Sequence, residues 1–501
     1  MPAAPILSAM LTAPVYEVAL ETPLQAAPIL SAALGHRVWL KREDLQPVHS
    51  FKLRGAYVKM ARLSPEARAR GVVAASAGNH AQGVALAASR LGCQAVIVMP
   101  VTTPVLKVEA VRRLGAEVRL HGDTFDEAAA LARTLAEGGL TPVPPYDDPD
   151  VIAGQGTVGL ELLRQRPGGL DAVFVPVGGG GLIAGVATCL KQLAPQVKVI
   201  GVEPADSDCL ARALEAGRPV SLDHPGLFAD GVAVRQVGAL PFTLCRDTVD
   251  EVVRVGTDEI CAAIKDVFCE NRSLLEPSGA LAVAGLRTWA AGRRNLDLAA
   301  ILSGANLDFD RLRFVAERAG TGDSVEAVLA VTIPERPGSF LAFCELIGQR
   351  PITEFNYRRS DPEAAHVFVG VKAGGRAEAR ELVDRLRGAG LGALDLTDDE
   401  LAKTHLRHMT WGRAPDPGRE HLFRFEFPER PGALLKFLRR MAPGWDITLF
   451  HYRNHGADVG RVLAGLLVPP EDEADLLDAL ADLGYPWVDE TASPAYRALL
   501  L

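Results

Sequence analysis

A chain of 501 residues is too long for one ordinary domain and predicts about two to four compact units, each with its own core. Apolar residues make up 48% and charged residues 23%, which excludes a largely disordered chain. The net charge of −9 argues against nucleic acid or an anionic membrane as the main partner, and no apolar run approaches the length that spans a bilayer.

The cysteines and the N-terminus indicate the compartment. The seven cysteines are scattered and contain no C-x-x-C pair, which favours reduced thiols over a disulfide framework or a zinc site. The first residues lack the basic region of a secretory signal. We therefore expect a cytoplasmic protein.

Short β-branched runs alternate with alanine-rich segments between about residues 70 and 310. The pattern predicts strands at 72–75, 95–99, 117–120, 172–177 and 298–301, and helices at 81–90, 104–115, 125–136 and 183–190. Such alternation is typical of parallel sheets with helices on both faces. The predicted fold class of this part is α/β.

The pattern changes at residues 321–324, a small polar stretch that we interpret as a linker. Beyond it the chain contains a duplication. Pro-Glu-Arg-Pro-Gly at 334–338 recurs at 428–432, and Phe-Asn-Tyr-Arg at 355–358 matches Phe-His-Tyr-Arg at 450–453. Agreement at two places in register predicts a duplicated α+β module, at 325–398 and 420–493. A structural repeat without a ligand remains the alternative.

Two segments near the N-terminus contain candidate reactive groups. Lys52 follows Phe51 and is flanked by small residues, which suits a partly buried, nucleophilic amine, although an ordinary surface lysine has the same pattern. The run from Ser76 to His80 lies between a predicted strand and a helix, where backbone N–H groups bind anions. Ser76 and Asn79 could equally be helix caps, and His80 a structural histidine.

A glycine run from Gly178 to Gly181 follows a buried strand and lets the backbone approach a phosphate closely. The same run fits a dinucleotide fingerprint, with Glu203 where a ribose-binding acid belongs, so a nicotinamide oxidoreductase stays open. Ser303 follows the apolar run 298–301 and is expected at the C-terminal end of a strand, where open α/β sheets bind ligands. It could also simply cap the next helix.

Together, Ser-Phe-Lys, Ser-x-Gly-Asn-His, Gly-Gly-Gly-Gly-Leu and Ser-Gly-Ala-Asn resemble, in order and spacing, the β-family (fold type II) of pyridoxal-phosphate enzymes. Within that family the chain is most similar to the biosynthetic threonine dehydratases (threonine deaminases), because its duplicated tail resembles their paired ACT-like regulatory domain. The resemblance implies a catalytic domain of two parallel-sheet subdomains at 1–320, the smaller at about 50–147.

The resemblance also implies a role for each motif residue. Lys52 would be joined covalently to pyridoxal 5'-phosphate and act as the catalytic base, with Phe51 beside the ring. Asn79 would hydrogen-bond the phenolic oxygen, Ser303 would face the pyridine nitrogen, and Ser76, beside Asn79, would take the substrate carboxylate. The phosphate would be held by the amides of Gly178, Gly179, Gly180, Gly181 and Leu182.

The implied reaction converts L-threonine, or L-serine as a competing substrate, by loss of the β-hydroxyl. From threonine it would give 2-oxobutanoate and ammonia, the first step of isoleucine biosynthesis. Isoleucine would inhibit through the C-terminal domain, valine would oppose it, and the chain would form a homotetramer. Related enzymes use acids after a Glu-Pro pair for a divalent ion; here Cys209 stands where one carboxylate would be expected, so we predict no metal.

Three alternatives stay open. A serine-preferring dehydratase or a cysteine synthase is the nearest neighbour within the family. A nicotinamide oxidoreductase belongs to a different class and accounts for the glycine run alone. A non-catalytic amino-acid sensor would need the front domain to be a relic, against which the intact Lys52, Asn79 and Ser303 count.

Overall fold

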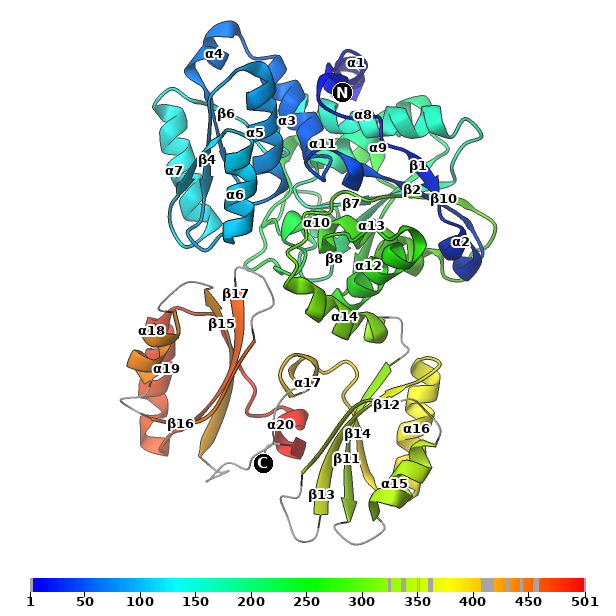
Figure 1. Cartoon of the computed structure of the whole chain (residues 1–501), viewed down its shortest axis with the longest axis vertical. Helices are drawn as coiled ribbons and strands as arrows, with labels where there is room; N and C mark the ends of the chain where they lie inside the picture. Colours follow the sequence, from blue (N-terminus) through cyan, green and yellow to red (C-terminus); the bar gives the residue numbers. More distant parts are fainter. Residues whose placement is uncertain are drawn as a thin grey trace. The chain divides into compact units, whose positions relative to one another are not determined.

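The computed structural model describes residues 3–322, 326–334, 339–348, 350, 352–358, 364–406, 419–428, 433–441, 445–453 and 459–499. They belong to two compact units, Met1–Phe309 and Asp310–Leu501 (Figure 1). The first unit is built on parallel sheets and the second on antiparallel sheets, which confirms the predicted fold class. Among the described residues, no helix is long and apolar enough to cross a membrane.

The smaller subdomain of the first unit is a parallel sheet with the strand order β5-β4-β3-β6. Its strands are β3 (Val72–Ala75), β4 (Ala95–Met99), β5 (Glu117–Leu120) and β6 (Thr141–Pro142). Its helices are α3 (Lys52–Ala61), α4 (Pro65–Arg70), α5 (Asn79–Leu91), α6 (Val105–Arg113) and α7 (Phe125–Glu137). Both faces of β3 and β4 are covered: Ala74 and Ile97 pack toward α3 and α5, and Val73 and Val96 toward α7.

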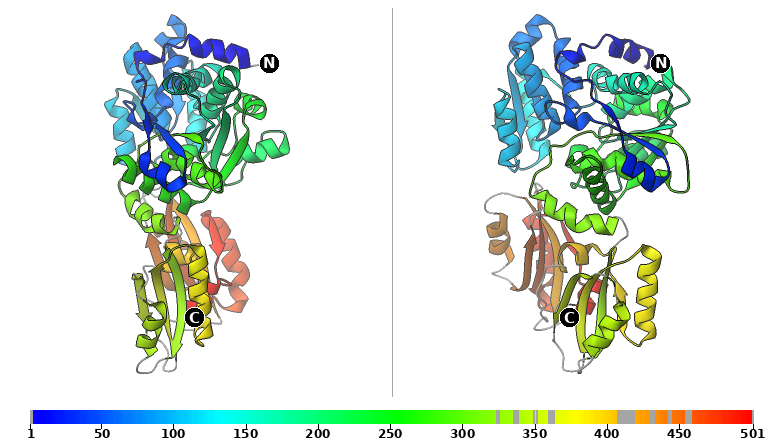
Figure 2. Two further views of the ribbon diagram at one scale, coloured as in Figure 1. Left: turned by 90° about the vertical axis from the view of Figure 1, so that its right-hand side faces the viewer. Right: turned by 45° about the vertical axis from the view of Figure 1, so that its right-hand side comes forward.

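The larger subdomain has the strand order β1-β2-β10-β7-β8-β9, and only β1 runs antiparallel. Its strands are β1 (Leu24–Ala26), β2 (Arg37–Lys41), β7 (Ala172–Pro176), β8 (Lys198–Pro204), β9 (Glu251–Val255) and β10 (Asp297–Ile301). Its helices are α1 (Ala3–Leu11), α2 (Pro28–Leu34), α8 (Pro149–Gln165), α9 (Gly181–Leu193), α10 (Cys209–Ala216), α11 (Ala239–Thr248), α12 (Thr257–Asn271) and α13 (Pro277–Ala290). Helix α1, in dark blue, packs against α8 at the top of both views in Figure 2.

The second unit begins with helix α14 (Arg311–Gly322) and then repeats one arrangement twice. The first module contains β11 (Glu326–Pro334), α15 (Ser339–Ile347), β12 (Ile352–Arg358), β13 (Ala364–Lys372), α16 (Arg376–Gly388), β14 (Gly392–Asp395) and α17 (Glu400–Thr404). The second contains β15 (Glu420–Pro428), α18 (Ala433–Met441), β16 (Asp446–Arg453), β17 (Val459–Leu467), α19 (Glu473–Leu483), β18 (Trp487–Asp489) and α20 (Pro494–Leu499). The sheet orders, β12-β13-β11-β14 and β16-β17-β15-β18, match strand for strand.

Matching sheet orders are what the duplicated sequence pattern predicts. The Pro-Gly turns, 335–338 and 429–432, lie outside the described residues. So do residues 323 and 324 of the predicted linker, whose first two residues belong to helix α14. The boundary between the two compact units, after Phe309, therefore lies earlier in the chain than the predicted linker. Helix α14 accounts for the difference.

Candidate active site

Lys52 is the first residue of helix α3 and is partly buried. Its Nζ donates to the carbonyl of Pro145 at 3.0 Å and lies 5.4 Å from the centre of the Phe51 ring. Removal of water lowers the pKa of the amine to about 8, and the negative charge of Glu276 opposes that shift. An amine with this pKa is neutral often enough near physiological pH to act as a nucleophile or base.

Asn79 begins helix α5, and its side chain does not cap that helix. Its Nδ2 donates to Glu276 Oε1 at 2.5 Å, and its Oδ1 accepts from Asn306 Nδ2 at 2.6 Å. Ser76 Oγ accepts from the Gly78 N–H at 3.2 Å, a local turn contact. The cap interpretation is therefore wrong for Asn79, whereas Ser76 does stabilise its own turn.

His80 is a buried, neutral histidine. One ring nitrogen, Nε2, lies 2.8 Å from the carbonyl oxygen of Val143. Burial, together with the charge of Lys52, lowers the pKa of the imidazole to about 3. A base with so low a pKa is a poor proton acceptor at neutral pH, so the structure favours a structural role for His80.

The glycine run closes tightly onto Tyr146. A side-chain carbon at Gly179 would lie 2.2 Å from the Tyr146 ring, and one at Gly181 would lie 3.0 Å from the Tyr146 Cα. Gly180 has φ +90°, which side chains disfavour. Helix α9 begins at Gly181, two residues before the predicted start, so the Gly181 and Leu182 amides belong to its first turn, which binds anions.

Ser303 follows strand β10, as predicted, and only 3% of it is exposed. Its hydroxyl donates to the carbonyl of Ser278 at 3.1 Å. Its own carbonyl accepts from the N–H of Phe51 at 3.2 Å, and Gly304 pairs with Ser50 in an antiparallel bridge. Backbone contacts thus tie the serine segment to the lysine segment.

The four segments selected from the sequence meet at one place. A side-chain carbon at Gly83 of α5 would lie 3.0 Å from the Lys52 backbone, so α5 and α3 touch there. The Lys52 amine contacts Pro145, and the next residue, Tyr146, covers the glycine run. Asn306, three residues after Ser303, bonds to Asn79.

Sequence reasoning missed one member of this site, Glu276. The residue precedes α13 and is 4% exposed, and its carboxyl faces Asn79 instead of capping its own helix. Burial, reinforced by the charge of Asp230, raises its pKa to about 7. The only local signal is Glu276-Pro277, which is typical of an ordinary helix start.

The dinucleotide alternative fails at Glu203. The structure buries this carboxylate completely, and its two oxygens accept from the amides of Leu210 and Ala211 at 2.9 Å each. It therefore caps helix α10 and has no oxygen turned toward a ribose. The strand order of the sheet also differs from that of dinucleotide-binding folds.

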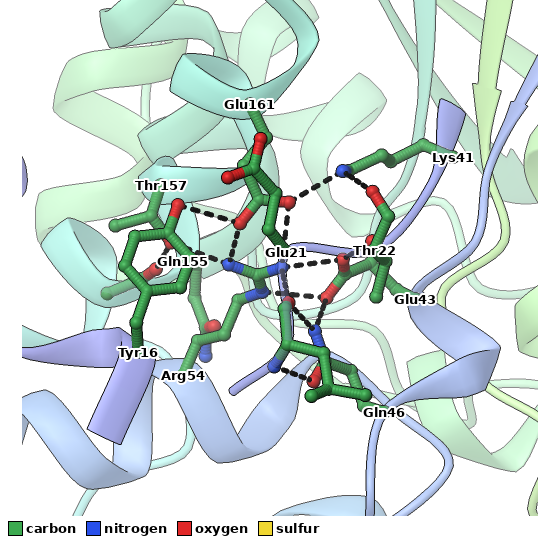
Figure 3. Close-up of polar contacts among 12 residues, drawn as sticks. Tyr16, Glu21, Thr22, Lys41, Glu43, Gln46, Arg54, Gln155, Thr157 and Glu161 are labelled. Atoms are coloured by element: carbon green, nitrogen blue, oxygen red, sulfur yellow. Dashed lines mark hydrogen bonds and ion pairs between the residues drawn. The ribbon is translucent and has the colours of Figure 1, made fainter. Parts of the chain in front are cut away.

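A buried network of charges lies next to the site (Figure 3). Arg54, two residues after Lys52, bonds to Glu43 at 2.7 Å and to Glu161 at 2.6 Å. Lys41 bonds to Glu161 at 2.5 Å, and none of the four side chains is exposed. The network joins the start of α3, in the smaller subdomain, to β2 and α8, in the larger.

Comparisons with known proteins agree with this geometry. Residues 16–303 match the family described as pyridoxal-phosphate dependent enzyme, and residues 317–406 and 412–500 match the C-terminal regulatory domain of threonine dehydratase. The biosynthetic L-threonine dehydratase of Burkholderia multivorans is 57% identical over 500 residues, 99% of each chain. That of Escherichia coli K12 is 55% identical over 498 residues, 99% of this chain and 96% of the relative.

Solved structures include the processed form of threonine deaminase isoform 2 from Solanum lycopersicum. It is 53% identical, with a TM-score of 0.63, and the match covers 64% of this chain and 88% of that one. The sequence identity extends over the full length of the chain, both domain matches agree with it, and the four segments meet in one site. All three findings indicate the same family. The chain belongs to the pyridoxal-phosphate dependent enzymes, and within them to the family of biosynthetic threonine dehydratases.

Proposed function

We propose that the protein uses pyridoxal 5'-phosphate to convert L-threonine to 2-oxobutanoate and ammonia, the first step of isoleucine biosynthesis. One observation carries the proposal: the half-buried Lys52 amine contacts Pro145, beside Tyr146, which covers the glycine run at the start of α9. An amine and an anion-binding helix start in one site suit a cofactor that carries both an aldehyde and a phosphate. L-Serine is the competing substrate, because it also carries a β-hydroxyl.

The residues present fit that cofactor. The tight glycine run at Gly178, Gly179, Gly180 and Gly181, followed by Leu182, offers the amides of a helix start. Added side chains would collide with Tyr146, Val232 or Pro241, so only glycine fits there. Lys52 has a lowered pKa, so its amine is free to react with an aldehyde. Asn79 offers an amide hydrogen to the phenolic oxygen, Phe51 lies beside Lys52, and Ser76 remains our candidate for the substrate carboxylate.

Each of these side chains has a task in the proposed reaction. When bound, the cofactor withdraws electrons from the Cα–H bond of the attached amino acid. Lys52 Nζ takes the Cα proton, and the β-hydroxyl leaves with a proton as water. The released enamine tautomerises and takes up one water, so the products, 2-oxobutanoate and ammonia, contain the same atoms as threonine.

Ser303 sets the polarity opposite the ring nitrogen in this proposal. Its hydroxyl donates to Ser278 in the structure, and the same hydrogen can turn to the ring nitrogen instead, which then accepts it. A neutral hydroxyl does not hold a proton on a pyridine nitrogen as a carboxylate does. The ring is then a weaker electron sink, which favours prompt loss of the β-substituent over longer-lived carbanion chemistry.

We assign regulation to the second unit, with ACT-like modules at 325–398 and 420–493. Isoleucine binds there and inhibits, and valine opposes it. One carboxylate joins the parts of this second unit: Glu400 accepts from Arg318 of α14 at 2.7 Å and from Arg461 of β17 at 3.1 Å. The first helix of the unit is therefore tied to both modules. A cytoplasmic homotetramer completes the proposal.

The deciding experiment measures 2-oxobutanoate release from L-threonine while isoleucine is titrated. We expect release that isoleucine suppresses sigmoidally, with a coupling of about 5- to 150-fold in affinity. Lys52→Ala is expected to abolish release, and near-normal turnover of that variant would refute the mechanism. Faster release from L-serine than from L-threonine would move the assignment to a serine dehydratase.

A shortened chain that ends at Gly322 tests the regulatory half separately. The first unit is compact by itself, so we expect this chain to stay soluble and active but to lose its response to isoleucine. Retained inhibition would show that the effector binds the catalytic unit. Unchanged valine antagonism in the shortened chain would contradict the assignment in the same way.

A further inference from the structure

Glu276 stands out among the buried acids because its carboxyl faces the candidate site. It occupies the N-cap position of α13, yet its side chain accepts no capping hydrogen bond from a backbone N–H of that helix. Instead, Oε1 accepts from Asn79 Nδ2 at 2.5 Å. No residue in the described part of the chain forms an ion pair with it. A carboxyl placed in this way is not explained by helix capping or by a salt bridge.

The hydrogen bonds around Asn79 have only one possible direction. The carbonyl of Val48 can only accept, and it accepts from Asn306 Nδ2 at 2.9 Å. The same amide nitrogen donates to Asn79 Oδ1 at 2.6 Å. Asn79 must therefore turn its Nδ2 toward Glu276, and the second hydrogen of Nδ2 remains available to a ligand. The chain of bonds fixes both ends of the Asn79 amide.

The glycine after Ser303 makes room for this carboxyl. A side-chain carbon at Gly304 would lie 2.2 Å from Glu276 Oε1 and 3.2 Å from Asn79 Nδ2. The N–H of Glu276 also donates to the carbonyl of Gly304 at 3.3 Å. Two segments that the sequence pattern selected, the asparagine and the serine segments, are thus built around the Glu276 carboxyl.

We propose that Glu276 is a positioning residue of the reaction, which fixes the Asn79 amide and places a negative charge in the same site as the Lys52 nitrogen. The inference rests on the proposed function, because it takes Lys52 as the residue that binds the cofactor. The inference adds a negatively charged protein side chain, the Glu276 carboxylate, to the proposed site. The glycine run and Ser303 are neutral and cannot provide such a charge.

The charges facing Glu276 come from three elements. Asp230, in the short helix Asp230–Val232, raises the pKa of the carboxyl, while Lys107 of α6 lowers it. Lys107 and Asp230 pair with each other at 2.7 Å. Burial is the largest effect and places the pKa at about 7. Glu276 in turn raises the pKa of Lys52 against the effect of burial.

The test titrates the visible absorption of the bound cofactor with pH in the full-length holoenzyme and in E276Q. Glutamine keeps an acceptor for Asn79 but removes the charge, so the Lys52 nitrogen should lose its proton more easily. A neighbouring charge shifts a pKa by about 1–3 units, and we expect the absorption midpoint to fall by about one pH unit. The rising limb of the kcat–pH profile should move in the same direction.

Glu203 supplies the matched control. It is also fully buried, and its pKa is also raised to about 7, but it caps α10 instead of facing Asn79. E203Q should lose stability and keep the wild-type midpoint, whereas E276Q should shift it. An unchanged midpoint in E276Q, or an equal shift in E203Q, would overturn the role of Glu276.

E276D covers the case in which E276Q does not fold. Its carboxylate keeps the charge but is one methylene shorter, so the midpoint should fall by less than the one pH unit expected for E276Q, and a fall of a full unit in E276D would count against the proposal. Failure of the proposed function looks different. A wild-type protein without a borohydride-reducible visible chromophore would refute that function itself, whatever the Glu276 variants do.

Discussion

The buried charge network beside the lysine predicts a large stability loss on Glu161→Gln. Two cations, Lys41 and Arg54, face two carboxylates, Glu43 and Glu161, and no part of these side chains is exposed. The four formal charges balance. Removing one carboxylate leaves two buried cations to share Glu43 and breaks the contacts of Glu161 to Lys41 at 2.5 Å and to Arg54 at 2.6 Å.

The expected loss of stability on Glu161→Gln follows from the burial of these side chains. Breaking a buried pair by removing one partner costs about 3–5 kcal/mol, because the remaining charge stays desolvated. The matched control is Glu109→Gln, which removes an exposed pair: Glu109 is 42% exposed and Arg112 is 49% exposed. Surface pairs contribute about 0–1 kcal/mol. The two substitutions are chemically identical, so their difference isolates the effect of burial.

Hydrogen exchange of the α3 amides, Lys52–Ala61, is the appropriate assay, because a chain of two units does not unfold in one step. We expect the free energy of opening of α3 to fall by about 3–5 kcal/mol in Glu161→Gln. In Glu109→Gln it should fall by no more than about 1 kcal/mol. A loss below about 1 kcal/mol in Glu161→Gln, the range of a surface pair, would refute the reasoning. The network would then be solvated in solution.

Three further predictions concern pH, the glycine run and the serine. The cationic partner Arg54 lowers the pKa of Glu43 despite its burial. The network should therefore stabilise the protein above the ordinary carboxyl pKa of 4.5 and lose that contribution as the pH falls through the lowered pKa. Acid unfolding monitored by hydrogen exchange would detect this loss. Gly180→Ala and Gly115→Ala both place alanine at positive φ, +90° and +91°, at a backbone strain of about 1–2 kcal/mol each. The new carbon at Gly180 would also lie 2.9 Å from Pro241, whereas the one at Gly115 meets nothing within 4 Å. Only Gly180→Ala should weaken cofactor binding, and equal dissociation constants would contradict the anion-binding role of the run. Ser303→Asp should protonate the ring nitrogen, changing the cofactor spectrum and the product ratio, and an unchanged spectrum would show that residue 303 does not face the ring.

Local sequence patterns predicted the elements that position the site. The runs Val72–Ala75 and Ala95–Met99 form strands at the predicted bounds, because buried parallel strands need apolar residues on both faces. Helix α9 was harder. We predicted its start at residue 183, after the glycine run, but the helix begins at Gly181, which packs against Tyr146.

Contacts between distant side chains could not be predicted in this way. Arg54 and Glu161 are 107 positions apart, and Asn79 and Glu276 are 197 positions apart. No periodicity or capping pattern relates such residues. Asn79 at a predicted helix start fitted a cap as well as a ligand group, and only the position of Glu276 in three dimensions decides between the two.

The contrast between Glu43 and Glu276 shows what pairing does to a buried carboxyl. Both are almost completely buried, and burial raises the pKa of each. At Glu43 the bonds from Arg54 outweigh burial, so the charge is permanent and serves the fold. At Glu276 the main partner is a neutral amide, so burial is not outweighed and the pKa rises to about 7. Glu203 has an equally high pKa, but both of its oxygens accept from backbone amides and cap a helix. Burial alone therefore does not make a carboxyl part of the site.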